Sequence, residues 1–181
     1  MKRGFTLVEI LVSITLFLVV MTVAMGSVVS IINDNRKVGS SKTVMDNLNF
    51  AMESMAREIR FGKNYHCITA GDSGPYSTTQ NCPSGGAAIS LYSQEGTQVI
   101  YRLNGTTIEL STDNGTSYIP VTASDVIIQS LTFYVFGANP PPTDSLQPRV
   151  IIRIKGYVGA GQDQTSFVLE TQVSQRELDR D

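Results

Sequence analysis

A run of 23 residues without a charged side chain, Ile10–Ile32, constrains the fold of this chain more than any other feature of its sequence. In a helix, about 1.5 Å of rise per residue gives such a run a length of roughly 35 Å, which is enough to cross a bilayer. The run therefore predicts a membrane-spanning helix. Glu9 stands directly before it, and an ionised carboxylate there costs on the order of 2.5 to 3.5 kcal/mol by insertion scales unless it is neutralised. The sequence thus predicts a neutralising partner for Glu9.

The residues ahead of the run, MKRG followed by FTLVE, form a recognisable signal. Together with the run, they resemble the class III signal of type IV prepilins and type II secretion pseudopilins. The resemblance covers about the first 30 residues. It implies that a membrane-embedded prepilin peptidase cleaves between Gly4 and Phe5 and methylates the new amino terminus of Phe5. It also implies that Glu9 meets the N-terminal amine of a neighbouring subunit, a cation that would remove the cost of an isolated charge in lipid.

The same resemblance implies where the protein acts and with what. Its partners would be other pilin or pseudopilin subunits, the prepilin peptidase and the lipid of the inner (cytoplasmic) membrane. Lys2 and Arg3 flank the helix on its short N-terminal side, so this end should stay in the cytoplasm while the rest is exported. A single-pass protein of this kind would later enter a pilus or pseudopilus.

Two simpler interpretations compete with the prepilin signal. An ordinary secretory signal peptide would have basic residues, an apolar core and a small-x-small cleavage site, which Ala24-Met25-Gly26 could supply. The apolar stretch is much longer than the usual 7 to 15 residues of such a signal, and Glu9 interrupts its start. A plain uncleaved anchor on an exported domain leaves Glu9 unexplained.

The chain divides into four predicted segments. Residues 1–4 are the leader peptide, 5–32 the transmembrane and filament-core helix, 33–61 the amphipathic half of that helix, and 62–181 a β-rich globular domain. From Phe5 to Phe61 there is no proline, and only Gly26 and Gly39 weaken a helix, so one long helix is predicted.

The second half of this helix carries an amphipathic stripe. Its members recur at helical spacing and are Val38, Met45, Leu48, Met52, Met55 and Ile59. Such a stripe predicts packing against a sheet rather than a partner groove or cofactor box. Glu53 and Arg57 lie four residues apart, in the order that favours an ion pair on a helix.

Two cysteines in an exported domain most simply form one disulfide, here Cys67 with Cys82. Residues 62–86 are rich in Gly, Pro, Ser, Thr and Asn and predict a long loop, which this disulfide would staple. In the chain-entropy model it would contribute roughly 3 kcal/mol. His66 and Asp72 could complete a zinc site with the cysteines, but Cys-x14-Cys is not a standard ligand spacing. The disulfide is preferred, and neither a metal nor another cofactor is predicted.

After Ala87 the hydrophobic period changes from helical to two, which indicates strands. The predicted strands contain Ile89–Leu91, Val99–Leu103, Ile108–Leu110, Tyr118–Val121, Val126–Phe136, Arg149–Val158 and Gln164–Val173. Asn104-Gly105 predicts a two-residue hairpin turn with positive φ at both positions. In Val126–Phe136 the predicted buried face is Ile127, Leu131, Phe133 and Val135. The fold class is therefore α+β, with an antiparallel sheet covering the helix stripe, in agreement with the pilin-like fold that the resemblance implies.

Composition excludes several functions. Residues 33–181 hold 12 basic and 15 acidic side chains, a net charge of −3, with no basic tract, so no nucleic-acid partner is expected. The single histidine lies beside the predicted disulfide, no nucleophile elbow or phosphate loop is present, and the protein is predicted not to be an enzyme.

These features favour a structural subunit of a type IV pilus or type II secretion pseudopilus that initiates the filament or sits at its tip. Met45–Arg60 and the strand ending near Arg176 are similar to the minor pseudopilin J and minor pilin W branch of the family, although the apolar run lacks the proline of many major pilins. The alternatives are a tip adhesin or DNA-uptake minor pilin, with loop 67–82 or the Pro140 loop as contact surface, or a simple signal-anchored exported domain. Sequence alone leaves the machine served unassigned.

Overall fold

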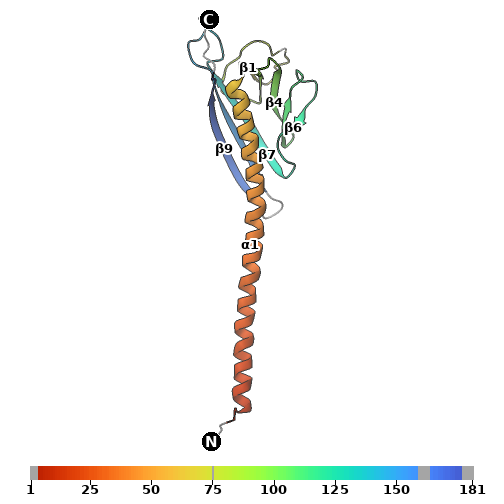
Figure 1. Ribbon diagram of the computed structural model, residues 1–181, viewed down its shortest axis with the longest axis vertical. Helices are drawn as coiled ribbons and strands as arrows, with labels where there is room; N and C mark the ends of the chain where they lie inside the picture. Colours follow the sequence, from red (N-terminus) through yellow and green to blue (C-terminus); the bar gives the residue numbers. More distant parts are fainter. Residues whose placement is uncertain (1–3, 75, 159–163, 177–181) are drawn as a thin grey trace. The chain divides into compact units, whose positions relative to one another are not determined.

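The computed structural model describes residues 4–74, 76–158 and 164–176. The chain separates into two units, residues 1–40 and residues 41–181, and each is described by itself. The helix α1 (Leu7–Phe61) contributes residues to both units, and the described part of the second unit contains nine strands (Figure 1). The strands are β1 (Lys63–Ile68), β2 (Cys82–Gly86), β3 (Ala88–Tyr92), β4 (Gln98–Asn104), β5 (Thr107–Ser111), β6 (Ile119–Pro120), β7 (Val126–Phe136), β8 (Arg149–Val158) and β9 (Thr165–Ser174).

The first unit is the apolar part of α1. Leu7–Ile32 forms 26 residues with a mean hydropathy of 2.6, long and apolar enough to cross a membrane, and none of it is buried against the rest of the protein. The hydroxyls of Ser13, Thr15 and Thr22 donate to the carbonyls four residues earlier at 2.7–2.8 Å. Because these hydroxyls are bonded within the helix, they can enter hydrocarbon without losing a partner.

The second unit is built around the last turns of α1. The predicted stripe is confirmed from Met45 onward, since Leu48, Met55 and Ile59 have no exposed surface and Met52 is 8% exposed. Ala51, which the stripe omitted, is also fully buried. The side chain of Val38 lies outside the described residues.

The C-terminal end of α1 is held by a side chain from the next strand. The buried Tyr65 hydroxyl donates to the carbonyl of Ile59 at 2.6 Å and lies 3.1 Å from the carbonyl of Gly62. The first bond adds to that of the Gly62 amide on the Ile59 carbonyl, one of the helix-end carbonyls that have no partner within the helix. A Cβ at Gly62 would collide with the end of the Leu91 side chain of β3 and crowd the Glu58 and Tyr92 carbonyls, so glycine allows β3 to pack closely here.

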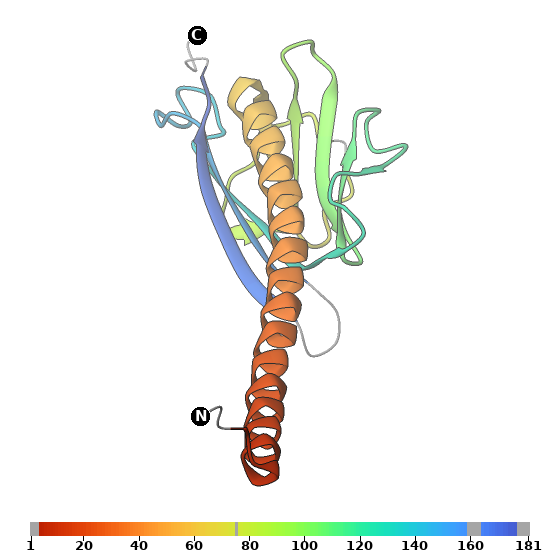
Figure 2. The ribbon, with the colours of Figure 1, turned by 60° about the horizontal axis from the view of Figure 1, so that its bottom comes forward.

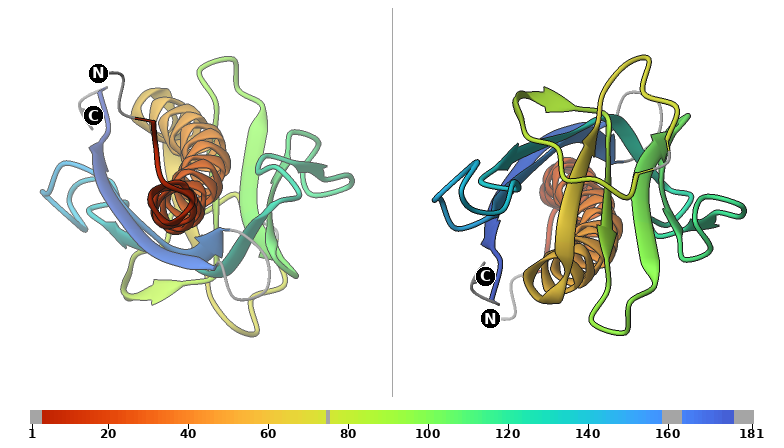
Figure 3. Two further views of the ribbon diagram at one scale, coloured as in Figure 1. Left: turned by 90° about the horizontal axis from the view of Figure 1, so that it is seen from below. Right: turned by 90° about the horizontal axis from the view of Figure 1, so that it is seen from above.

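Two antiparallel sheets pack against the buried stripe of this part of the helix. Sheet A has the order β1-β3-β4-β5-β6, and sheet B has the order β2-β7-β8-β9. Figures 2 and 3 show residues 41–61 lying between β7–β9 of sheet B, in teal and blue, and β3–β5 of sheet A, in green. One hydrophobic core joins the helix stripe to both sheets, and Ile89, Phe133 and Ile152 are among its fully buried members. The predicted α+β class is confirmed.

The prediction of a loop over residues 62–86 is wrong at both ends. Lys63–Ile68 is strand β1, which pairs with β3, and Cys82–Gly86 is strand β2, which pairs with β7. Only residues 69–81 lie between them. Glycine and proline lower strand propensity, but a free sheet edge can impose pairing on such a segment. Strand β2 shows the resulting irregularity, since its register with β7 shifts and Gly85 has a positive φ of 95°.

The buried face of β7 differs from the predicted one because the strand contains a bulge. The register with β8 shifts between Ile128 and Ser130, which places one extra residue in β7. Before this bulge Val126 and Ile128 are buried, whereas Ile127 is only half-buried. The prediction for Ile127 is therefore wrong, while Leu131, Phe133 and Val135 are buried as predicted.

The hairpin between β4 and β5 is present, but its turn is shifted by one residue. Asn104 pairs with Thr107, so the two turn residues are Gly105 and Thr106. Among them only Gly105 has a positive φ, of 58°. Glycine at the first turn position is the signature of a type II′ turn, whereas the sequence predicted positive φ at Asn104 as well.

Candidate functional site

The bond between Gly4 and Phe5 lies in an exposed, non-helical segment. Both residues precede α1, Phe5 is 80% exposed, and a Cβ on Gly4 would meet no other atom within 4 Å. The helix starts just after them because Thr6 caps it: its Oγ1 accepts the Glu9 amide at 3.3 Å, and its carbonyl accepts the Ile10 amide at 3.2 Å. A protease could therefore reach this bond without first unwinding the helix.

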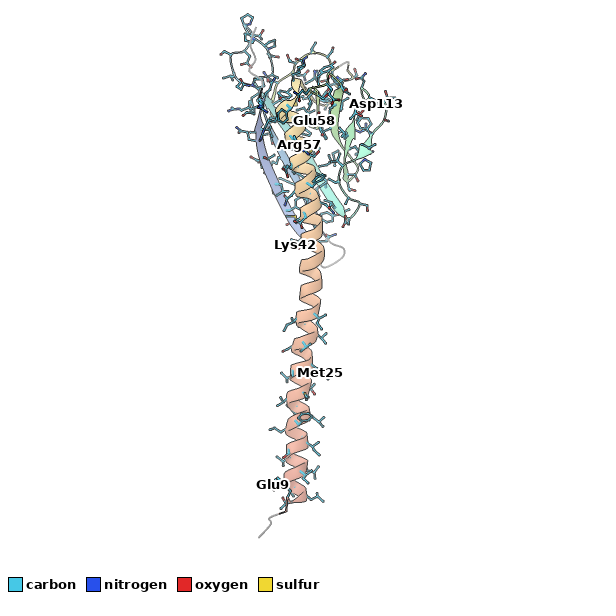
Figure 4. The ribbon with its side chains drawn as sticks, viewed as in Figure 1. Glu9, Met25, Lys42, Arg57, Glu58 and Asp113 are labelled. Atoms are coloured by element: carbon cyan, nitrogen blue, oxygen red, sulfur yellow. A yellow bond between two sulfur atoms is a disulfide. The ribbon has the colours of Figure 1, made fainter. Side chains whose placement is uncertain are left out.

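Glu9 occupies the first turn of α1 and is exposed (Figure 4). A carboxylate there is stabilised by the partial positive charge of the helix N-terminus. Within the described part of the chain, no group pairs with this carboxylate; only the Glu9 backbone is hydrogen-bonded. The carboxylate is thus available to form an ion pair with a cationic group of another molecule.

The segment that follows presents apolar side chains in all directions. Leu7 is 75% exposed, Leu16 68% and Val23 68%, with no polar face between them. A helix that is apolar all round requires lipid or other helices around it. The structure thus combines a membrane-length apolar surface with a carboxylate at its start that pairs with no described residue.

The disulfide lies in the second unit and joins the two sheets. Cys67 of β1 bonds to Cys82 of β2, with their Cα atoms 5.9 Å apart, so the bond links an edge strand of sheet A to an edge strand of sheet B. Both cysteines are buried. Gly86 packs against the Sγ of Cys67, and any side chain there would collide with it. The disulfide therefore fixes the seam between the sheets as well as closing loop 69–81.

The buried side chain of His66 anchors loop 69–81 through two hydrogen bonds. It is 4% exposed, its Nδ1 lies 2.6 Å from the carbonyl of Thr78, and its Nε2 lies 3.0 Å from Oδ2 of Asp72. The ring also contacts the ring of Tyr76, with centroids 5.2 Å apart. Because a carbonyl only accepts, Nδ1 donates to Thr78. Both ring nitrogens and both cysteines are thereby occupied, and within the described ranges no three His, Cys, Asp or Glu side chains form a metal site.

A groove of about 800 Å³ opens between the end of α1 and the β3–β4 hairpin. Its lining includes the charged side chains Arg57, Glu58 and Glu95 and the floor residues Val99, Tyr101 and Leu110. Burial raises the pKa of the Tyr101 phenol, and the negative charge of Glu58 raises it further. The ion pair predicted between Glu53 and Arg57 is not formed, since neither residue makes a salt bridge with any described residue.

Asp113 orders the turn after β5 (Figure 4). Its Oδ1 accepts the Ser111 hydroxyl at 2.7 Å and the Ser117 amide at 2.9 Å, and its Oδ2 accepts the Ser117 hydroxyl. The hydrogen bonds from Ser117, then that from Ser111, lower the pKa of Asp113 to about 2. The sequence predicted this turn from Asp113-Asn114-Gly115, and the structure adds the serine network as its cause.

The first 25 residues match a family model described as the prokaryotic N-terminal methylation motif. No curated protein and no solved structure matches the chain. The matched residues include the exposed bond after Gly4, Glu9 and most of the membrane-length segment. This motif implies a type IV pilin-like or pseudopilin-like substrate of the prepilin peptidase, and it suggests a structural protein that assembles with other pilin-like subunits.

Proposed function

We propose that this chain is a minor subunit of a type IV pilus or type II secretion pseudopilus. The methylation motif at residues 1–25 carries the proposal. The prepilin peptidase would remove residues 1–4 and methylate Phe5, leaving the subunit in the cytoplasmic membrane with residues 33–181 outside. Neighbouring subunits would then extract the apolar helix into a filament, in which the protein serves initiation or the tip.

Two properties of the N-terminal segment support this proposal. The exposed bond between Gly4 and Phe5 precedes the helix, as cleavage by a peptidase requires. The apolar surface of Leu7–Ile32 has no covering element within the described residues, and a bundle of like helices would replace its lipid contacts by protein contacts. In such a bundle, the methylated amine of one subunit would neutralise Glu9 of another.

The mature amino terminus provides the direct test. We expect protein isolated from membranes of cells with an active prepilin peptidase to begin at Phe5 and to carry one added methyl group, as measured by intact mass and N-terminal peptide mapping. The matched control is the same protein from cells without the peptidase, which should begin at Met1. A terminus near Ser27, or an unprocessed chain in the presence of the peptidase, would instead identify a secreted domain or a plain anchor.

A further inference from the structure

Part of the loop between β1 and β2 covers the outer face of sheet A. His66 lies between two residues of β1 that belong to the shared core, so its side chain is on the opposite face of the sheet. The side chain is nevertheless buried, because part of loop 69–81 lies against it. We call the described residues of that part, 72–74 and 76–78, the cover.

Three side-chain hydrogen bonds attach the cover to the sheet. Two come from His66, to the carbonyl of Thr78 and to Oδ2 of Asp72. The third comes from β4, where the buried Gln98 donates from Nε2 to the carbonyl of Tyr76 at 3.0 Å. Among the described residues, no backbone hydrogen bond joins the cover to a strand. His66 therefore supplies most of the polar attachment.

The two hydrogen-bond partners of His66 have no hydrogen to donate. A carbonyl oxygen only accepts, and so does an ionised carboxylate. Both ring nitrogens must therefore carry a proton when both bonds form. Because imidazole is a stronger base than a carboxylate, the second proton rests on Nε2, and His66 is a cation paired with Asp72. A buried cation requires such partners, and the cover supplies both of them.

The groups that surround the ring of His66 identify which charge can change. The cover contributes Asp72 and Tyr76, and β3 contributes Ser90, which is opposite His66 in the register. Cys67, the next residue, is held in the disulfide. A phenol ordinarily stays neutral up to about pH 10, whereas an imidazole ordinarily changes charge between about pH 5 and 8. The histidine is therefore the group of this cluster that changes charge near neutral pH.

The cover is not tightly packed on the sheet. Strand β3 lies between β1 and β4, so a segment bonded to both of these strands passes over it. Ser90 of β3 has no exposed surface, and its Oγ has no hydrogen-bond partner in the described part of the chain. A cavity of about 370 Å³ also lies between the cover and Tyr92, Gln98 and Asn114. Opening would hydrate the Ser90 hydroxyl and lose little packing, so the closed state depends on the bonds from His66.

We propose that the cover is a pH-sensitive device that cationic His66 holds closed. When Nε2 loses its proton as the pH rises, its lone pair faces the carboxylate of Asp72 and that bond is lost. The cover then opens and exposes Ser90 and Gln98 on the outer face of sheet A. The stabilisation is thus present at low pH and is lost as the pH rises through the titration of His66. The proposal goes beyond the proposed function and does not depend on it, because it concerns the second unit alone.

Exchange of the Nδ1 proton of His66 with water tests this device, because that proton is released only when the Thr78 carbonyl moves away. The chain has one histidine, so NMR of the ¹⁵N-labelled full-length protein in detergent identifies the proton directly. Asp72→Asn is the decisive variant, since an amide can donate to a neutral Nε2 and accept from a protonated one. We expect the proton to exchange about tenfold faster in wild type than in this variant at pH 8.5, and equally fast at pH 5.5.

Two further variants separate the proposed device from general loosening of the loop. Asp125→Asn removes an exposed acid elsewhere and should behave like wild type at both pH values. Gln98→Leu removes an attachment that does not titrate and should speed exchange by the same factor at both. Equal exchange in wild type and Asp72→Asn at pH 8.5, with the native disulfide intact in both, would overturn the proposal. So would a wild-type excess of the same size at pH 5.5. The amino terminus does not enter this measurement, so its result leaves the proposed function untouched.

Discussion

At the scale of single residues, the charged and polar side chains of this protein divide into those that the fold satisfies and those that it leaves free. Asp113 and His66 are satisfied locally, by serine and backbone partners in their own loops. Glu9, Arg57 and Glu58 are unpaired within the described residues. The first kind orders turns, and the second kind is available for contact with other molecules.

The Asp113 turn should depend on pH. Its pKa is lowered to about 2 in the folded protein from an ordinary value of 3.8, so the stabilisation is complete above pH 3.8 and is lost as the pH falls through about 2. We expect Asp113→Asn to speed hydrogen exchange of residues 111–117 at neutral pH, with the difference from wild type disappearing near pH 2. Mass spectrometry of peptides from the full chain measures this, with the exposed Asp125→Asn as control. A difference that persists at pH 2 would show that charge is not the cause.

At the scale of secondary-structure elements, the disulfide connects the edge strands of the two sheets, beside backbone hydrogen bonds that join β1 to Gln80 and Ala87 on either side of β2. β1 belongs to sheet A and β2 to sheet B, and their pairing partners are β3 and β7. The two cysteines are 15 residues apart. The link therefore restricts the unfolded chain and also holds the seam between the sheets.

Removing the disulfide should destabilise the second unit more than it disturbs the first. We expect Cys67→Ala with Cys82→Ala to lower the free energy of unfolding by roughly 3 kcal/mol, because the unfolded chain regains the entropy of a loop of about 15 residues. Urea unfolding of the full chain in detergent, followed by the fluorescence of its tyrosines, measures the change. Reduced wild-type protein is the control and should behave like the double variant. An unchanged midpoint would mean that packing and backbone hydrogen bonds hold the seam without the disulfide.

At the scale of the whole molecule, one helix serves two environments. Leu7–Ile32 is apolar all round, whereas residues 45–59 bury one stripe in a core shared with both sheets. Both segments belong to one continuous helix, Leu7–Phe61. A chain of this kind can exchange lipid for other helices at one end while its folded domain stays unchanged at the other.

Assembly into a filament should depend on Glu9, whereas insertion of the helix into the membrane should not. We expect Glu9→Ala to enter the membrane and to be cleaved after Gly4 as well as wild type, because the apolar run and the cleavage bond are unchanged. Its recovery in sheared filament or pseudopilus fractions should fall at least tenfold, since the amine of its neighbour then has no counter-charge in lipid. Asp46→Ala, an exposed acid on the same helix, should assemble normally. Normal assembly of the Glu9 variant would refute the proposed pairing.

The sequence by itself determined the helix, the α+β class, most strands and the N-terminal motif. These depend on local properties, namely hydropathy over consecutive residues, helical or alternating spacing, and a short contiguous signal. The cysteine pairing was also predictable, because the chain has two cysteines and both lie in a domain that is expected to be exported. Cleavage at Gly4, methylation of Phe5 and the partner of Glu9 stay predictions.

Only the tertiary structure decided which strands pair and what their pairing brings together. β1 and β2 have poor local strand signals and form because sheet edges bond to their backbones. The bulge in β7 moves Ile127 off the core face, and the groove combines Glu58, Glu95 and Tyr101 from three separate elements. The physical reason is that these features are set by hydrogen bonding and packing between residues far apart in the chain, which no local pattern encodes.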